Sequence, residues 1–452
     1  MGASLAYGRT GIVVFTALLT MGAVRADPLL VDAAKERDWD AVRRLVEGGA
    51  DVGATAPDGA TALHWASYWD DVDAAALLLR AGADANATND LGATPLWNAS
   101  LNGSAAMVRA LLVAGADPNA ALLSGETPVM TSARTGSPDV LELLLSAGAD
   151  PNTRATRGQT ALMWAASQGH ADAVRVLLRH GADVHMRSDT WSQVMAVPPH
   201  ADPANQQSVP HGAHTALLFG VRTGDLASAR LLVEAGADVN DADAWGVSAT
   251  VLAAHSGFAD LVEMLLEAGA DPDAAAAGFS ALHLAVLRRD VAMVRTLLAH
   301  GADPNARIAT WTPTRRASAD WSIHPSLMGA TPFWIAARFG QPDAMRLLGE
   351  HGADPHFVHE VTYVGAAGSF GSESRTEVTN TLMAAAGMGG PRNLGGFIDP
   401  HPAAAEALSL EAVKVALELG VDRAATDLEG WTATERSRYQ TVREYLGSLA
   451  GR

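Results

Sequence analysis

Apolar residues recur along the chain in paired blocks whose spacing is typical of amphipathic helices. In one pair the first block contains Leu162 and Ala165, and the second contains Val174, Leu177 and Leu178, with a short glycine-containing turn between them. The second block stops at a Gly-Ala-Asp triplet, whose glycine suits a left-handed helix C-cap. The pattern predicts helix–turn–helix units that cannot bury their apolar faces alone and must stack on their neighbours.

The triplet marks a repeat of 33 residues. It begins at Gly49, Gly82, Gly115, Gly148 and Gly181, returns at Gly236, Gly269, Gly301 and Gly352, and has a relative at Gly420. A second signature, often twelve residues later, opens the first helix with a hydroxyl side chain at Thr61, Thr94, Thr127, Thr160, Thr215, Ser280 and Thr331. These hydroxyls predict N-caps, and proline follows several of them at the first helical position, where no hydrogen bond is lost.

A period of 33 residues with signatures such as Thr61-Ala-Leu-His-Trp-Ala closely resembles the ankyrin repeat. The resemblance covers nearly the whole chain after residue 26 and implies about ten to eleven repeats. The implied fold is an all-α ankyrin-repeat solenoid, an α/α superhelix of helix–turn–helix units with β-hairpin fingers. In this family the signature histidine hydrogen-bonds the backbone between repeats, which implies structural roles for His64 and His283.

Residues 1–26 have the features of a secretory signal peptide cleaved after Ala26. Arg9 precedes an apolar run at 11–24, which is shorter than the roughly 20 residues of a membrane span. An uncleaved N-terminal anchor is the alternative. Lysine occurs only at Lys35 and Lys414, and alanine is abundant, which favours a GC-rich bacterial genome. We therefore expect a periplasmic or secreted protein.

The repeat array is predicted to span residues 27–449, with an N-terminal capping unit at 27–51 and a C-terminal one at 431–449. Four stretches interrupt the period. Three of them enlarge the fingers, at residues 184–213, 304–329 and 355–379. A fourth, rich in glycine and proline, separates two helices at 387–408. Insertions in a repeat array map to loops on one face, which is often the binding face.

The enlarged fingers carry aromatic and arginine residues, which are favoured as binding anchors. These are Trp191, Trp311, Trp321, Tyr363, Arg187, Arg307, Arg315 and Arg316. Two interpretations stay open: direct contact with a partner, or aromatic side chains that fold back to cover their own long loops.

The last turn of each first helix lines the concave surface of an ankyrin array. Two positions per unit, over nine units, give 18 positions, of which five are basic and one is acidic. The protein as a whole has 50 acidic and 32 basic residues, so this groove is predicted to be less negative than the remaining surface and to favour an acidic peptide or protein. Ankyrin sequences also tolerate arginine here without a functional reason. The candidates for contact are Tyr68, Trp69, Arg134, Arg222 and Arg338.

Candidate chemistry is sparse. The absence of cysteine excludes disulfides, thiol catalysis and cysteine metal sites, and a net charge of −18 argues against sequence-independent binding of nucleic acid. Histidines cluster near 200–214 and 356–359 without a metal-binding spacing, and residues 387–396 lack the lysine of a phosphate-binding loop. We expect no cofactor and no metal.

The sequence therefore predicts an exported, non-enzymatic protein that binds another protein through a concave groove and elongated fingers, with its oligomeric state open. The alternative is a ligand- or metal-handling protein, possibly hydrolytic, with a site between the inserted loops and the groove. Its members would be His200, His211, His324, His359 and Asp202.

Overall fold

The computed structural model describes residues 28–196, 206–311, 323–367, 371–389 and 402–449. Within them, 22 α-helices form eleven consecutive helix pairs. The first helices of the pairs are α1 (Pro28–Lys35), α3 (Ala62–Tyr68), α5 (Pro95–Asn102), α7 (Pro128–Thr135), α9 (Ala161–Ser167), α11 (Ala216–Thr223), α13 (Ala249–Ser256), α15 (Ala281–Leu287), α17 (Pro332–Arg338), α19 (Thr381–Ala385) and α21 (Ala433–Arg436). The second helices are α2 (Trp39–Glu47), α4 (Val72–Arg80), α6 (Ala105–Val113), α8 (Pro138–Ser146), α10 (Ala171–Arg179), α12 (Leu226–Glu234), α14 (Ala259–Glu267), α16 (Val291–Ala299), α18 (Pro342–Glu350), α20 (Pro402–Glu418) and α22 (Gln440–Ser448).

Hydroxyl caps start the helices where the signatures place them. The Thr94 hydroxyl accepts a hydrogen bond from the Trp97 N–H, and Pro95 occupies the first turn of α5. At the other end of a pair, Gly82 follows α4 with a φ of 93°, a left-handed conformation that favours glycine. The Ala83 N–H then donates to the carbonyl of Leu78 at 3.0 Å, which closes a Schellman-type C-cap.

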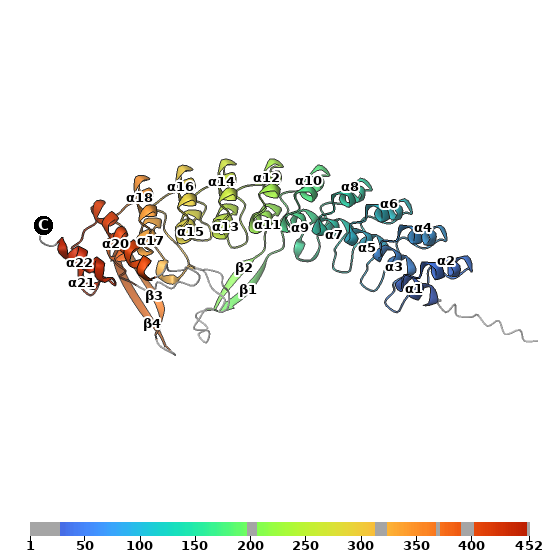
Figure 1. The fold of residues 1–452 in the computed structure, drawn as a ribbon, viewed down its shortest axis with the longest axis horizontal. Coiled ribbons are helices and arrows are strands. Elements are labelled where there is room, and N and C mark those ends of the chain that lie inside the picture. The colour runs from blue at the N-terminus through green and yellow to red at the C-terminus, as the bar shows by residue number, and fades with distance from the viewer. Residues whose placement is uncertain (1–27, 197–205, 312–322, 368–370, 390–401, 450–452) are drawn as a thin grey trace, which may run out of the picture.

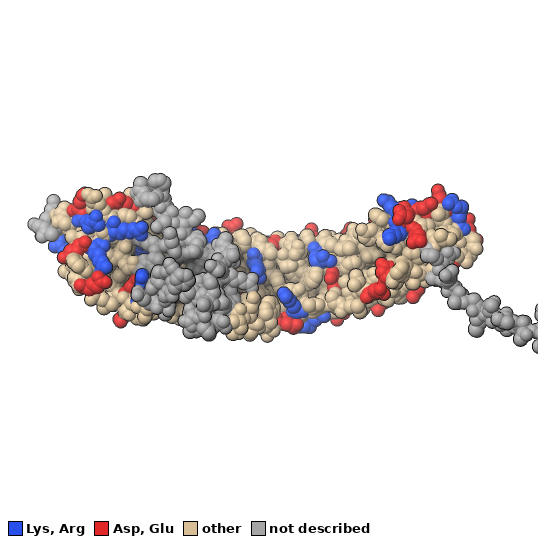
Figure 2. Space-filling view, turned by 90° about the horizontal axis from the view of Figure 1, so that it is seen from below, with Lys and Arg blue, Asp and Glu red and all other residues tan. Residues whose placement is uncertain are grey.

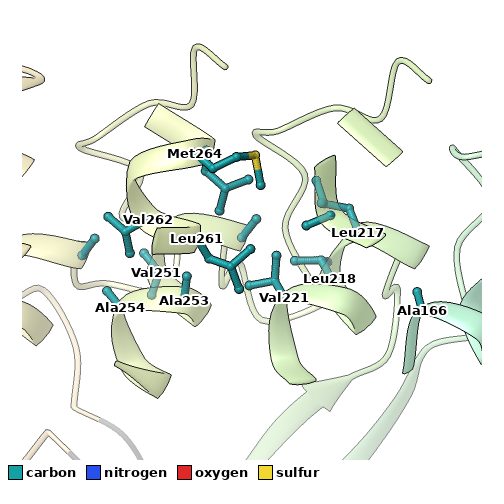
Figure 3. Close-up of a cluster of buried hydrophobic side chains, with 14 of the residues drawn as sticks. Ala166, Leu217, Leu218, Val221, Val251, Ala253, Ala254, Leu261, Val262 and Met264 are labelled. Carbon is teal, nitrogen blue, oxygen red and sulfur yellow. The ribbon is translucent and has the colours of Figure 1, made fainter. Parts of the chain in front are cut away.

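The helix pairs stack into one arch with a continuous apolar interior (Figure 1). Figure 3 shows this interior where Val221 of α11 faces Leu261 of α14, both of which are buried. Each unit thus covers the apolar face of the next, as stacking requires. None of the helices in the described ranges combines the length and the apolar character that a membrane span needs.

Polar side chains also join neighbouring units. The Asn119 amide donates to the Gly148 carbonyl at 3.2 Å and accepts from the Asp150 N–H at 2.8 Å. Backbone hydrogen bonds connect successive finger tips as well, for example from the Leu123 N–H to the Leu91 carbonyl at 3.0 Å. These contacts recur at the repeat spacing and hold the fingers in a row along one side of the arch.

Two enlarged fingers form antiparallel hairpins that project from the same side of the arch (Figure 1). The first consists of β1 (Trp191–Ala196) and β2 (Gln206–His211), and the second of β3 (Val358–Ala367) and β4 (Gly371–Asn380). Between them in sequence, the described part of the finger predicted at 304–329 contains a 3₁₀ turn, η3 (Pro325–Leu327). A similar turn, η1 (Thr156–Gly158), forms the tip of an ordinary finger.

The insertion predicted at 387–408 is shorter than expected as a loop, because residues 402–408 belong to α20. This helix has 17 residues, whereas the second helices α2 to α18 have nine each. The segment Pro-Ala-Ala-Ala-Glu-Ala-Leu that opens it is rich in strong helix formers. The glycine- and proline-rich residues before it are typical of a loop, so the sequence pattern did not predict that α20 begins at Pro402.

Candidate binding surface

The finger side of the arch exposes charged residues mainly at its two ends. Figure 2 views this side and shows mixed acidic and basic groups over both ends of the array, whereas the visible middle is mostly uncharged with scattered charged residues of both signs. The acidic excess of the whole protein is therefore not spread evenly over this face.

An aromatic cluster lies at the last turn of α3. The Tyr68 side chain is 48% exposed and packs edge-on against Trp69, with ring centroids 4.8 Å apart. Two cations of the first helix pair border the cluster. Arg37 lies over the Trp69 ring at 4.9 Å, and Lys35 lies over the Trp65 ring at 5.8 Å. The Trp69 indole donates to the Lys35 carbonyl at 3.2 Å, which fixes its orientation. The arrangement offers a preorganised aromatic surface with positive charge at its border.

The three arginines predicted to line the groove differ in their exposure and in their interactions with neighbouring side chains. Arg222, at the end of α11, is exposed. Arg134 bonds the Glu126 carboxylate at 3.0 Å and lies over the Trp164 ring at 5.3 Å, so its charge is partly compensated.

Arg338 does not line an open groove, so that expectation is wrong. Its side chain is only 1% exposed, and its guanidinium donates to the Met388 carbonyl at 2.6 Å and lies 5.6 Å from the Trp334 ring centre. Arg338 thus ties α17 to the residues that follow α19.

Tyr363 is likewise buried, at 5% exposure, which contradicts its expected place as an exposed finger contact. Its hydroxyl donates to the Glu377 carboxylate across the β3–β4 ladder at 2.7 Å. Burial, together with this carboxylate, raises the pKa of Tyr363 above its usual range. The residue holds its own hairpin together, in line with the fold-back interpretation.

Two histidines of the alternative hypothesis, His324 and His359, lie beside the buried Tyr363 and Trp334. The His324 ring packs edge-on against Tyr363 at 5.7 Å, and His359 donates to the Met328 carbonyl at 2.8 Å while it lies 4.1 Å from the Trp334 ring. Burial lowers the pKa of both imidazoles, which favours their neutral forms. We call Arg338, Trp334, Tyr363, His324, His359 and Glu377 the hairpin lock, since they hold β3–β4 against α17.

The hairpin lock contains two histidines and one glutamate, but these side chains are not grouped as metal ligands would be. Across the described ranges, no group of three or more His, Asp or Glu side chains is placed to hold a metal ion. His211 lies on the other hairpin, away from the lock both in sequence and in the fold (Figure 1). His200 and Asp202 lie outside the described residues.

The first enlarged finger carries a three-layer stack. Trp191 is 42% exposed; its ring stacks on His211 with centroids 5.6 Å apart, and Arg157 of the preceding finger lies 5.1 Å from its centre. Arg187 pairs with Asp241 and donates to the carbonyls of Ala213 and Ala242 at 3.1 and 2.8 Å, so it clamps this finger to the next one.

The remaining finger candidates divide into two groups. Arg307 lies 5.0 Å from the centre of the Phe357 ring, and Trp311 is half-buried. Trp321, Arg315 and Arg316 lie outside the described residues. Sequence reasoning missed Arg157 and Glu377, although Arg157 precedes Trp191 by about one repeat and an approach of neighbouring finger tips could have been inferred from that spacing.

Comparison with known proteins identifies the family. Models of the ankyrin repeat match residues 30–121, 98–188 and 214–308 as groups of three copies and residues 328–360 as a single copy. These matches together cover more than half of the chain, which therefore belongs to the ankyrin repeat family. Ankyrin repeats are generally protein–protein interaction modules, and proteins built from them are typically non-enzymatic scaffolds.

One similar solved structure is the human ASB11 ankyrin repeat domain. It shares 27% sequence identity with this chain at a TM-score of 0.44, and the match covers 54% of this chain and 98% of that domain. No curated protein matches this sequence.

Proposed function

We propose that this protein is an exported, non-catalytic scaffold that binds another protein, with an acidic surface or peptide as the contacting element. The observation that carries the proposal is the exposed Tyr68 packed on the half-buried Trp69, bordered by Lys35 and Arg37. Tyr68 stands at the same repeat position as the exposed Arg222. Aromatic residues and arginine dominate the energetics of protein interfaces, and a rigid array loses little ordering entropy on association.

Reversing one groove charge tests the acidic nature of the partner. Arg222→Glu should weaken binding of the partner about tenfold at low salt and less at high salt. The reason is that an exposed charge acts mainly by attracting the partner electrostatically during association, and salt screens this attraction. The partner is first captured by cross-linking in the exported fraction and identified. Its binding to the purified variants is then measured by biolayer interferometry. Arg230→Glu makes the same change on the exposed side of α12 and should leave binding intact. Equal losses in the two variants, or none in either, would contradict the proposal.

Export rests on the features of residues 1–26. We expect N-terminal sequencing of protein from the periplasmic or culture fraction to begin at Asp27. Replacing Leu18 and Leu19 by arginine breaks the apolar run and should leave full-length protein in the cytoplasm. Full-length wild-type protein retained in the cytoplasm would refute export and leave the binding proposal intact.

A further inference from the structure

The first hairpin has one strand edge that is open and unprotected. We propose that the outer edge of β1 binds an extended segment of a protein partner as a third antiparallel or parallel strand, with a carboxylate of that segment at Arg157. The inference rests on the proposed function, since it assumes a protein partner, and it adds the place and the mode of contact.

The strand register shows which backbone groups point outward. Trp191 pairs with His211, and Ser192 pairs with Pro210. A proline nitrogen carries no hydrogen, so the hydrogen-bonded pairs of this ladder are Trp191–His211 and Gln193–Val209. The N–H and C=O groups of Ser192 and Val194 therefore point away from β2. A single added strand can bind all four of them.

The neighbouring fingers show which way this edge faces. The Asp189 N–H, just before β1, donates to the Arg157 carbonyl of the preceding finger at 2.8 Å. On the other strand, the Gly212 carbonyl accepts from the Ala244 N–H of the following finger at 3.0 Å. The edge of β1 thus faces the preceding finger, which ends in the short turn η1. The β1–β2 hairpin itself projects from the finger side of the arch (Figure 1).

The exposure and chemistry of β1 leave the edge available. Ser192 and Val194 are exposed, and the Val194 side chain is 64% exposed. Exposed edges are usually protected by charge or by proline, and β1 has neither in its sequence Trp-Ser-Gln-Val-Met-Ala. The outer edge of β2, in contrast, lacks a donor at Pro210.

The charge beside the edge points to the chemistry of the occupant. Arg154 pairs with Asp189 at 2.7 Å, so these two charges compensate each other. Arg157 lies over the Trp191 ring, is exposed, and makes no ion pair with any residue in the described ranges. An incoming strand passes this guanidinium, which favours a carboxylate there, either from an acidic side chain or from the C-terminus of the bound segment.

The test uses the whole mature protein and a displayed library of peptides about eight residues long with free C-termini, a length that suffices for one strand. The peptide selected is then synthesised. Val194→Pro removes an outward donor of β1 and should weaken its binding at least tenfold. Ser208→Pro, at the position paired with Val194, makes the same change on the outer edge of β2 and should leave binding unchanged. Arg157→Glu should also weaken it about tenfold.

Hydrogen exchange of Ser192 and Val194 in the wild-type protein should slow when the peptide binds, and circular dichroism confirms that both proline variants stay folded. The proposal is overturned if no peptide is selected, if Val194→Pro binds as well as wild type, or if both proline variants lose binding equally. A concentration-dependent dimer that Val194→Pro abolishes would make a second copy the occupant and overturn the partner assigned here. The Arg222→Glu result is independent, so it separates failure of this inference from failure of the proposed function.

Discussion

Lowering the pH from about 7 to about 4.5 should reduce the free energy of unfolding, with His283 contributing the most among the buried histidines. In the native state its Nδ1 accepts a hydrogen bond from the Ser280 N–H at 3.2 Å and its Nε2 donates to the Ala306 carbonyl at 3.1 Å. Both ring nitrogens are thereby used by a neutral imidazole. Burial lowers the pKa of His283 from 6.5 to about 4.

The sign follows from proton binding. Between the two pKa values the unfolded state binds a proton on His283 that the folded protein does not, so stability is full above about pH 6.5 and falls as the pH drops towards about 4. This interval corresponds to roughly 3 kcal/mol. The pKa values of His64, His214, His324 and His359 are also lowered, first of all by burial, so they act in the same direction.

Urea unfolding followed by circular dichroism at several pH values measures the effect. His283→Met is the matched control, because methionine stands at the corresponding position of three other repeats, as Met130, Met163 and Met383. This variant should be less stable at neutral pH, since the hydrogen bonds of both ring nitrogens are lost, but its stability should depend less on pH. An unfolding midpoint that does not move with pH, or an unchanged pH slope in the variant, would contradict the role given to His283.

Replacing Arg338 by alanine should destabilise the C-terminal part of the array by about 3–5 kcal/mol, the cost of removing one member of a buried charged group. A methyl group added to Gly389 would lie 2.9 Å from the Arg338 Nη1 and 3.1 Å from a Glu377 carboxylate oxygen, so both charges border the same small space. Without Arg338, Glu377 keeps its bond to Tyr363 but loses the nearby positive charge.

Hydrogen exchange localises this effect. The amides of residues 358–363 and 374–380 should exchange faster in Arg338→Ala, while those of the first helix pairs should not, because a solenoid unfolds locally. Arg346→Ala removes an exposed arginine of α18 that lies 3.5 Å from Asp343, and it should cost less than about 1 kcal/mol. If the two variants lose similar stability, Arg338 does not hold the hairpin lock together.

Much of the fold follows from short-range patterns. The Thr94–Pro95 start of α5 and the left-handed Gly82 after α4 act within a few residues, so their geometry could be predicted from sequence. The start of α20 was missed because a loop-like composition precedes it. The strands of the second hairpin were not predicted individually, although the Glu-Val-Thr-Tyr-Val and Arg-Thr-Glu-Val-Thr stretches are rich in β-branched and aromatic residues.

The candidate surface was less predictable, because the same residue type plays opposite roles in different repeats. Arg222 and Arg338 occupy equivalent positions, yet one is exposed and the other is covered. Trp191 and Tyr363 were both predicted as aromatic contacts on enlarged fingers. Trp191 stays partly exposed between Arg157 and His211, whereas Tyr363 is buried and bonds Glu377 across its own hairpin.

The amino-acid sequence by itself determines the repeat, its helix caps and the sites of insertion, because these depend on residues that are near one another in the sequence. Only the tertiary structure decides which arginines and aromatic residues remain available for contact and which strand edge is open. Those properties depend on what packs over a residue from the next finger or from a helix tens of residues away, and no local pattern encodes that approach.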